Sequence, residues 1–292
     1  MLLRRLQLLD PQRGDASFSF QKFDYAALRS AVRVNHFTIL WVQDGTGVWH
    51  VDANEYPFKG PALLFANPYQ TTFLVSEKAS GAHLSFHANF FCIETHHAEV
   101  GCNGVLFNNI YGAPVLEVQP DDASEFGRML GLMRDELGAA RLAHSEVLLS
   151  YLKVFLIKAT RIKLERDGGH FQEVGSKPEV LSKLIELIET HYHEKHRPAE
   201  YAKILSISEK ALNKIVRAHF GRTLTALIRE RVLKHAKWHL LHTQKPVKEI
   251  AAEIGFTDEF YFSRLFKRAT GMAPTAFREF ETRIRGGRNL SM

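Results

Sequence analysis

Short apolar runs separated by turn residues dominate the chain up to about Val118. Phe37–Val42 and Val48–Val51 flank the pair Asp44-Gly45, and an Asp-Gly pair between two such runs predicts a β-hairpin. Glycine and proline residues bracket Ala62–Phe65, which predicts another short strand. Further strands are expected at Thr72–Val75, His83–Phe91 and Val115–Val118. Short strands at this spacing favour a β-sandwich or a small barrel.

After Pro120 the apolar residues recur at helical spacing. One helix is predicted from Phe126, Met129 and Met133, and a second from about His144 to Glu165. The second helix has a broad apolar stripe, and such a stripe is either intramolecular core or the seam of a dimer. Two helices are therefore expected to follow the β-rich part.

Residues 167–178 combine glycine, proline and charge without any period, which predicts a linker. The chain then divides into a β-rich domain at 1–166 and a helical domain at 179–285. The expected fold is an α+β protein of two domains, with two helices appended to the β-rich part.

The helical part contains an internal repeat. Glu200–Gly221 aligns with Glu249–Gly271 when one residue is inserted in the second copy. In each copy a short helix is followed by a tight turn, a capping residue, and a second helix that ends at glycine. This is the pattern of a helix-turn-helix. Two such units are therefore predicted, joined by a long amphipathic helix at Leu224–His242.

The second helix of each copy has a polar face that carries the candidates for DNA contact. These are Lys210, Asn213, Lys214 and Arg217 in the first copy, and Glu259, Phe260, Ser263, Arg264, Lys267 and Arg268 in the second. Side chains near the start of a recognition helix meet base edges in the major groove, and later cations suit phosphates. The alternative is that these faces are the solvated sides of ordinary core helices.

Charge favours duplex DNA as the partner of the helical part. The chain has 292 residues and a net charge of +6. From Ser176 onward it has 22 Lys and Arg against 13 Asp and Glu, whereas the part before Ser176 has 16 against 19. Only the C-terminal part is therefore basic enough to favour a polyanion.

The C-terminal third resembles the AraC family of bacterial transcription regulators. The resemblance extends from about Leu181 to Glu281, and its most specific segment is Ile250–Lys267, followed by Gly271 and Phe277-Arg278. It implies a seven-helix DNA-binding domain with two recognition helices, whose base-facing residues are among those named above. It also implies regulation of transcription, as an activator or a repressor, in response to a small-molecule effector.

The sequence departs from this family within both recognition helices. Phe260 stands where the family usually has a small polar residue, and Ala211 and Val216 stand where an aromatic residue is common. The operator sequence is therefore not predicted.

The N-terminal part resembles, more loosely, the cupin barrel of the same family, through His36–His50 and Tyr56–Pro68. Metal-dependent cupins use two histidines and a carboxylate from one strand pair, and a later histidine. Here Thr38 occupies the ligand position after His36, and Gln70–Thr72 occupies the late position, so the ligand set is missing. No catalytic residue, metal or cofactor is expected, and a cupin-type enzyme is the rival interpretation.

Candidates for the effector site are aromatic and histidine residues expected at the mouth of the barrel. They are Trp41, Trp49, His50, His83 and His87, and packed core residues are the alternative for each. A second group of metal or redox candidates has a spacing that matches no zinc pattern. It consists of Cys92, His96, His97 and Cys102. Two such cysteines are more often buried as small apolar residues.

The remaining expectations concern location and partners. The first residues are too short and too interrupted for a signal peptide, and no apolar run reaches about 18 residues, so a cytoplasmic protein without a membrane partner is expected. The expected partners are duplex DNA, a small-molecule effector, RNA polymerase and a second copy of the chain. A regulator that binds DNA constitutively, with a structural N-terminal domain, is the alternative to a sensor.

Overall fold

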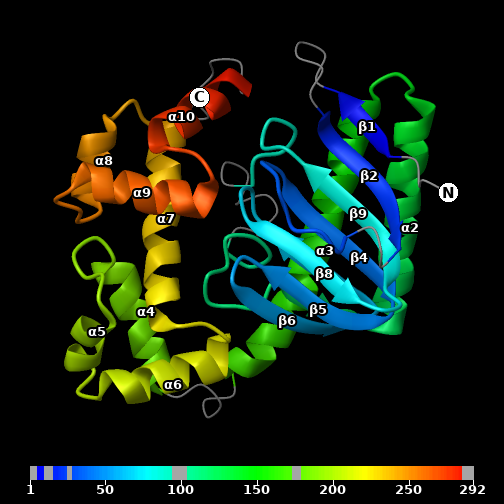
Figure 1. Ribbon diagram of the computed structural model, residues 1–292. Helices are drawn as coiled ribbons and strands as arrows, with labels where there is room; N and C mark the ends of the chain where they lie inside the picture. Colours follow the sequence, from blue (N-terminus) through cyan, green and yellow to red (C-terminus); the bar gives the residue numbers. More distant parts are fainter. Residues whose placement is uncertain (1–4, 10–15, 25–27, 94–103, 173–178, 285–292) are drawn as a thin grey trace. The chain divides into compact units, whose positions relative to one another are not determined.

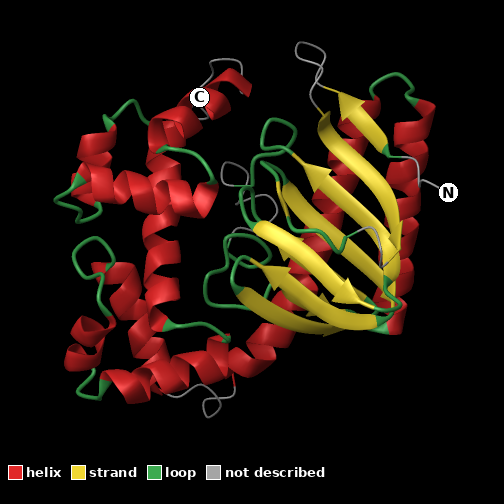
Figure 2. Cartoon of the chain, in the orientation of Figure 1, coloured by secondary structure: helices red, strands yellow, loops and turns green. Residues whose placement is uncertain are grey.

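The computed structural model describes residues 5–9, 16–24, 28–93, 104–172 and 179–284 (Figure 1). The chain divides into two compact units, one formed by Met1–Asn109 with Ala113–Gly169 and the other by Ile110–Gly112 with His170–Met292. The first unit contains the strands and two helices, and the second is helical (Figure 2). The prediction of a two-domain α+β protein is confirmed at this level.

The first unit has two antiparallel sheets. Their strands are β1 (Leu6–Leu9), β2 (Ala16–Asp24), β3 (Val32–Arg33), β4 (Phe37–Asp44), β5 (Thr46–Val51), β6 (Asn54–Lys59), β7 (Ala62–Ala66), β8 (Thr71–Ser76), β9 (Ser80–Phe86) and β10 (Val115–Glu117). One sheet has the order β1-β2-β9-β4-β7-β10, and the other has the order β3-β8-β5-β6. Among the described strands no pairing joins the two sheets, so the predicted closed barrel is not confirmed.

The hairpin predicted around Asp44-Gly45 is wrong. β4 pairs with β7 on one side and with β9 on the other, so neither edge of β4 is left for β5. The turn instead leads from one sheet into the other, and β5 forms its hairpin with β6. Gly45 permits this passage because its φ is +108° and a Cβ there would lie 2.7 Å from Cα of Ala79.

Both helices predicted after the strands are present, as α2 (Pro120–Ala139) and α3 (His144–Gln172). Most of the apolar residues of α3 are buried against the sheet. Val154 and Leu164 are exceptions, because they are 45% and 51% exposed. The helix also continues into the segment 167–178, which the sequence pattern assigns to a linker.

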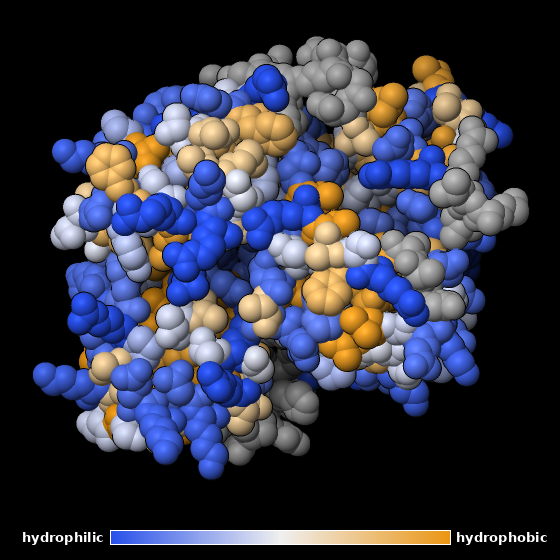
Figure 3. Space-filling model, viewed as in Figure 1, coloured by the Kyte–Doolittle hydropathy of each residue, from blue (hydrophilic) through white to orange (hydrophobic). Residues whose placement is uncertain are grey.

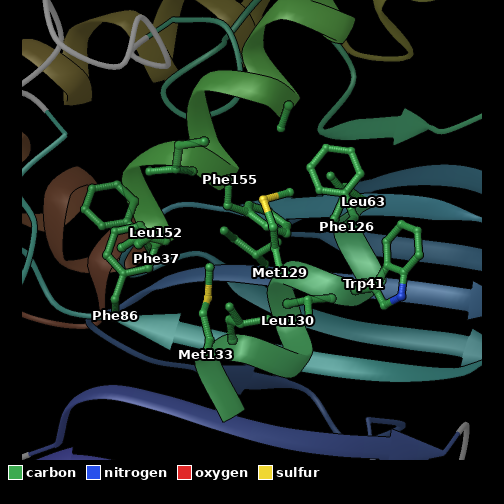
Figure 4. Packing of buried hydrophobic residues seen from close by; sticks show 14 of the residues in the cluster. Phe37, Trp41, Leu63, Phe86, Phe126, Met129, Leu130, Met133, Leu152 and Phe155 are labelled. Atoms are coloured by element: carbon green, nitrogen blue, oxygen red, sulfur yellow. The ribbon is translucent and has the colours of Figure 1, made fainter. Parts of the chain in front are cut away.

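The six-stranded sheet is buried on both faces. Trp41 of β4 and Phe86 of β9 pack with Phe126 of α2 and Phe155 of α3 in one cluster (Figure 4). Leu40 points to the other side of β4 and belongs to a second cluster, which fills the space between the two sheets. Burial on both sides explains why β4 is a continuous apolar run rather than an alternating one.

The second unit is built around one long helix. Its helices are α4 (Glu179–His191), α5 (Pro198–Ile204), α6 (Glu209–Phe220), α7 (Leu224–His242), α8 (Val247–Glu253), α9 (Glu259–Thr270) and α10 (Pro274–Ile284). α7 packs against α4, α6, α8 and α10 through buried residues that include Leu227, Ala236 and Leu240. α4, α5 and α6 lie toward one end of α7, and α8, α9 and α10 toward the other (Figure 1).

Two helix-turn-helix units are present, α5 with α6 and α8 with α9, as the internal repeat predicts. The turn of each unit contains one residue with positive φ, which is +56° at Ser206 and +82° at Gly255. A Cβ on Gly255 would lie 2.2 Å from the carbonyl oxygen of His193. Only glycine therefore fits the second turn without a shift of the backbone.

The second helix of each unit begins at a side-chain cap. Oγ of Ser208 accepts a hydrogen bond of 3.2 Å from the backbone N–H of Ala211. Oδ1 of Asp258 accepts two, from the backbone N–H groups of Phe260 at 2.8 Å and Tyr261 at 3.1 Å. These bonds satisfy donors that a helix start leaves without a partner, so they fix where α6 and α9 begin.

No helix within the described ranges combines the length and the apolar character that crossing a membrane requires.

Candidate nucleic-acid interface

α6 and α9 each bury one face and expose the other. The buried face consists of Leu212, Val216 and Phe220 in α6, and of Phe262, Phe266 and Thr270 in α9. These residues recur at three- and four-residue spacing, which keeps them on one side of each helix. The opposite side is left for contact with a partner.

The first recognition helix presents a cationic surface. Lys210, Lys214 and Arg217 are exposed on α6. Asn213 differs from them because it is partly buried, and its Oδ1 accepts a hydrogen bond of 3.2 Å from the backbone N–H of Leu224. Asn213 therefore fixes the start of α7 relative to α6, in addition to its predicted place among the DNA contacts.

The second recognition helix presents a mixed aromatic and cationic surface. Arg264, Lys267 and Arg268 are exposed on α9, and Phe260 is 74% exposed near its start. One aromatic ring and three cations of α9 are therefore open to a partner.

Two other predicted residues of α9 are less accessible, and one exposed neighbour was not among the candidates. Glu259 and Ser263 are partly buried. Tyr261 is 50% exposed beside them, and a carboxylate oxygen of Asp258 lies 3.9 Å from a guanidinium nitrogen of Arg264. The excess of aromatic residues after Asp258 was the signal that could have identified Tyr261.

Hydrophilic residues cover most of the visible surface of α5, α8 and α9, with single apolar residues among them (Figure 3). The polar face of α9 thus lies on a hydrophilic surface, and Lys210, Lys214 and Arg217 of α6 are exposed as well. An interpretation of α6 and α9 as helices covered by the rest of their own unit does not fit this exposure.

Two arginines hold the helices of this unit in place. The buried Arg222 forms an ion pair and hydrogen bond with Glu230 across the start of α7. The half-buried Arg278 of α10 donates hydrogen bonds to the carbonyl oxygen of Leu240 at 3.2 Å and of Lys245 at 2.6 Å. The second set fastens α10, which also packs against α9, to the turn between α7 and α8.

The candidates for the effector site do not form one cluster. Trp41 belongs to the core against α2 and α3, whereas Trp49 lies between the sheets and donates a hydrogen bond of 3.2 Å to the carbonyl oxygen of Phe65. His50 stacks on Phe73 with ring centroids 4.1 Å apart. It follows Trp49 on β5, and successive residues of a strand point to opposite faces of the sheet.

The other two histidines are His83, which lies on β9, and His87, which follows the end of that strand. The ring of His87 is buried and lies 5.5 Å from the ring of His36. Burial, with smaller effects of Arg5 and His36, lowers the pKa of His83 to about 4. Ser19 and Ser85 share a hydrogen bond of 2.7 Å on the neighbouring strands, so this end of the sheet contains a small polar group within its apolar core.

An open cleft in the first unit lies elsewhere. It has a volume of about 950 Å³ and is lined by the turn Asp44–Gly47, by Lys59 and Gly60, and by Phe73–Lys78. None of the five effector candidates belongs to its lining.

The metal or redox candidates are largely outside the described residues. Cys92 is described and is buried, as expected for a small apolar side chain. His96, His97 and Cys102 lie in the segment 94–103, which the structure does not describe.

Comparison with known proteins supports the helix-turn-helix units. Residues 201–279 match the family model described as a helix-turn-helix domain. The chain is similar to the HTH-type transcriptional activator RhaR of Enterobacter sp. (strain 638), with 28% identity over 175 residues, which cover 59% of this chain and 60% of that protein. A match to RhaR of Klebsiella pneumoniae subsp. pneumoniae has 38% identity over 72 residues, 25% of this chain and 26% of that protein. The chain thus matches less than two thirds of the length of these relatives.

Two solved structures give weaker likenesses. ToxT from Vibrio cholerae O395 has a TM-score of 0.38 and 16% identity, covering 91% of this chain and 98% of that one. The DNA-binding domain of AdpA, in complex with a target DNA, has a TM-score of 0.35 and 20% identity, covering 37% of this chain and 98% of that one. Both RhaR relatives are named as HTH-type transcriptional activators.

Proposed function

We propose that this chain, whose residues 201–279 match a helix-turn-helix domain model, is an AraC-type, sequence-specific DNA-binding regulator of transcription. The observation that carries the proposal is the pair of exposed polar faces on α6 and α9, each opposite a fully buried face. The same unit holds the excess of positive charge in the chain. A helix of this kind inserts into the major groove with its exposed side toward the bases.

The length of α7 supports simultaneous binding by both recognition helices. α7 has 19 residues, which corresponds to about 28 Å at the rise of an α-helix. Successive major grooves on one side of a duplex are about 34 Å apart. We therefore propose that α6 and α9 enter neighbouring major grooves, with Lys210, Lys214 and Arg264 near base edges and Arg217, Lys267 and Arg268 near phosphates.

Selection of bound sequences from random duplex DNA tests this function. The expected result is enrichment of a site with two conserved blocks separated by about one helical turn, since each recognition helix reads one block. Binding without enrichment of any sequence would leave only a nonspecific basic surface, and the regulator proposal would then be wrong.

For the first unit we propose two roles, binding of a small-molecule effector and formation of a homodimer. The polar group around His83 and the open cleft beside Asp44–Gly47 support the first role, since effector sites combine apolar walls with a few polar groups. The exposed apolar residues Val154 and Leu164 of α3 support the second. We also propose that the two sheets of the first unit form a cupin-like fold.

A constitutive regulator with a structural first unit is the alternative. Repeating the selection with a pool of metabolites, and measuring the melting temperature with each, separates the two, because a ligand that binds the folded chain raises its melting temperature. As a regulator the protein would act in the cytoplasm, on chromosomal DNA, and contact with RNA polymerase would distinguish an activator from a repressor.

A further inference from the structure

Two histidines on α7 lie next to the carboxylate that ends α8. His235, His239 and Glu253 each offer one ligand atom, and these atoms lie within 4.8 Å of one another. The two histidines are four residues apart, so they share one face of α7. Glu253 reaches them because α8 packs against α7. These residues are not on the polar faces of α6 and α9, so DNA binding does not account for them.

The imidazole of His239 contains a buried polar atom without a hydrogen bond. His239 is only 9% exposed, and its Nδ1 has no hydrogen-bond partner in the part of the chain that the structure describes. Its nearest acidic oxygen is Oε2 of Glu253, at 3.7 Å. That separation is too long for a hydrogen bond. It is close to the spacing of about 3.3 Å between two ligands that are each about 2.0–2.2 Å from one metal ion.

Neighbouring residues orient the other two ligands. The hydroxyl of Tyr192 lies 2.5 Å from Nδ1 of His235. When Nδ1–H donates to this oxygen, Nε2 keeps the lone pair that a metal needs, and such partners commonly fix the tautomer of metal-binding histidines. Lys245 donates a hydrogen bond to Oε1 of Glu253, so Oε2 is the carboxylate oxygen that remains for a metal.

The pKa shifts of His235 and Glu253 both favour metal binding. Burial, with smaller effects of His239 and Arg231, lowers the pKa of His235 to about 4. The hydrogen bond from Lys245 holds the pKa of Glu253 below its usual range. A neutral imidazole and an ionised carboxylate bind a cation without first losing a proton.

We propose that His235, His239 and Glu253 bind a divalent transition metal ion, for which Zn²⁺ is the best match to the donor set. Two imidazole nitrogens and one carboxylate oxygen, with a water molecule in the fourth position, are a recurrent zinc environment. The bound ion fastens the end of α8 to α7 and so stabilises the second helix-turn-helix unit. The site itself does not depend on the proposed DNA-binding function.

Zinc binding by the full chain tests the site in the absence of DNA. After removal of metals with a chelator, the protein is titrated with Zn²⁺ in a calorimeter, and its melting temperature is measured with and without Zn²⁺. We expect one equivalent to bind and the melting temperature to rise, since the ion binds the folded state. His239→Ala and Glu253→Gln are each expected to weaken binding at least tenfold.

One control variant and a second test variant make the result interpretable. His219→Ala removes an exposed histidine of α6 that is not part of the cluster, and zinc binding is expected to stay unchanged. Glu253→Gln alters an exposed side chain, so it reports on the site even if His239→Ala fails to fold. The proposal is overturned if the unaltered chain binds no zinc, or if Glu253→Gln binds zinc as tightly as the unaltered chain.

Discussion

Single residues in the turns set the direction of each recognition helix. Gly255 has a positive φ, and a side chain there would meet the carbonyl oxygen of His193. Ser206 occupies the same place in the first unit with a φ of +56°. The sequence repeat identified both turns, because each has a small residue followed by a capping residue. Glycine is required only at Gly255, because the carbonyl oxygen of His193 lies where a side chain would be. This contact joins residues far apart in the sequence, so the sequence did not predict it.

Gly255→Ala is expected to destabilise the chain by about 1–3 kcal/mol or more, because it adds a strained φ to a steric clash. Gly127→Ala is the matched control, since Gly127 lies within α2 and a Cβ there meets nothing within 4 Å. That control should be neutral or stabilising by up to about 1 kcal/mol. Chemical denaturation measures both, and equal stability of the two variants would show that the turn tolerates a side chain.

His83 predicts a pH dependence of stability. Its pKa is about 4 in the folded chain, chiefly because of burial, against about 6.5 when unfolded. Since the folded pKa is lowered, the unfolded chain binds the proton more readily, and stability is lost as the pH falls from about 6.5 toward 4. The contribution of His83 to the loss between pH 7 and pH 5 should be about 1–2 kcal/mol, and His235, whose pKa is also lowered to about 4, adds to the total.

His83→Gln should reduce that loss, measured as the free energy of unfolding at pH 7 and pH 5. If the variant and the unaltered chain lose the same stability between these two pH values, His83 does not contribute to the pH dependence.

At the scale of helices and strands, the sequence predicted the helices better than the sheets. Helical periodicity is local, so α6, α7 and α9 follow from the spacing of their own apolar residues. Strand pairing is not local, which is why the Asp44-Gly45 hairpin was wrong. β2 was missed although Phe18 and Phe20 alternate with polar residues, a pattern that predicts a strand. The sequence also did not predict that Trp41 and Trp49 lie in different clusters, because this depends on how the strands pair and on the face to which each side chain points.

The caps of the recognition helices give a prediction at this scale. Asp258 accepts two backbone hydrogen bonds and Ser208 accepts one. Asp258→Ala should therefore destabilise the chain by about 1–2 kcal/mol, and Ser208→Ala by about 0.5–1 kcal/mol. Urea denaturation measures the two losses. A larger loss for Ser208→Ala would contradict the observed capping geometry.

At the scale of the whole molecule, positive charge and the recognition helices lie in the same unit, and the exposed residues Val154 and Leu164 lie on α3 of the other. This division matches a DNA-binding part and a part that associates with a second copy. Val154→Glu is expected to shift the chain toward monomer, measured by sedimentation velocity across protein concentrations. Arg128→Glu, an exposed charge reversal on α2, is the control. If Val154→Glu does not alter the association, α3 is not the dimer surface.

The central claim is that α6 and α9 both contact DNA. The most direct test is the affinity of the full chain for a selected duplex at several salt concentrations, for the unaltered chain, Lys214→Ala on α6 and Arg264→Ala on α9. Each variant should bind more weakly by about 1–3 kcal/mol if its residue contacts a base, or show a salt dependence smaller by about one counterion if it contacts a phosphate. Lys183→Ala on α4 should bind as the unaltered chain does. Unchanged affinity and unchanged salt dependence in both Lys214→Ala and Arg264→Ala would contradict the account.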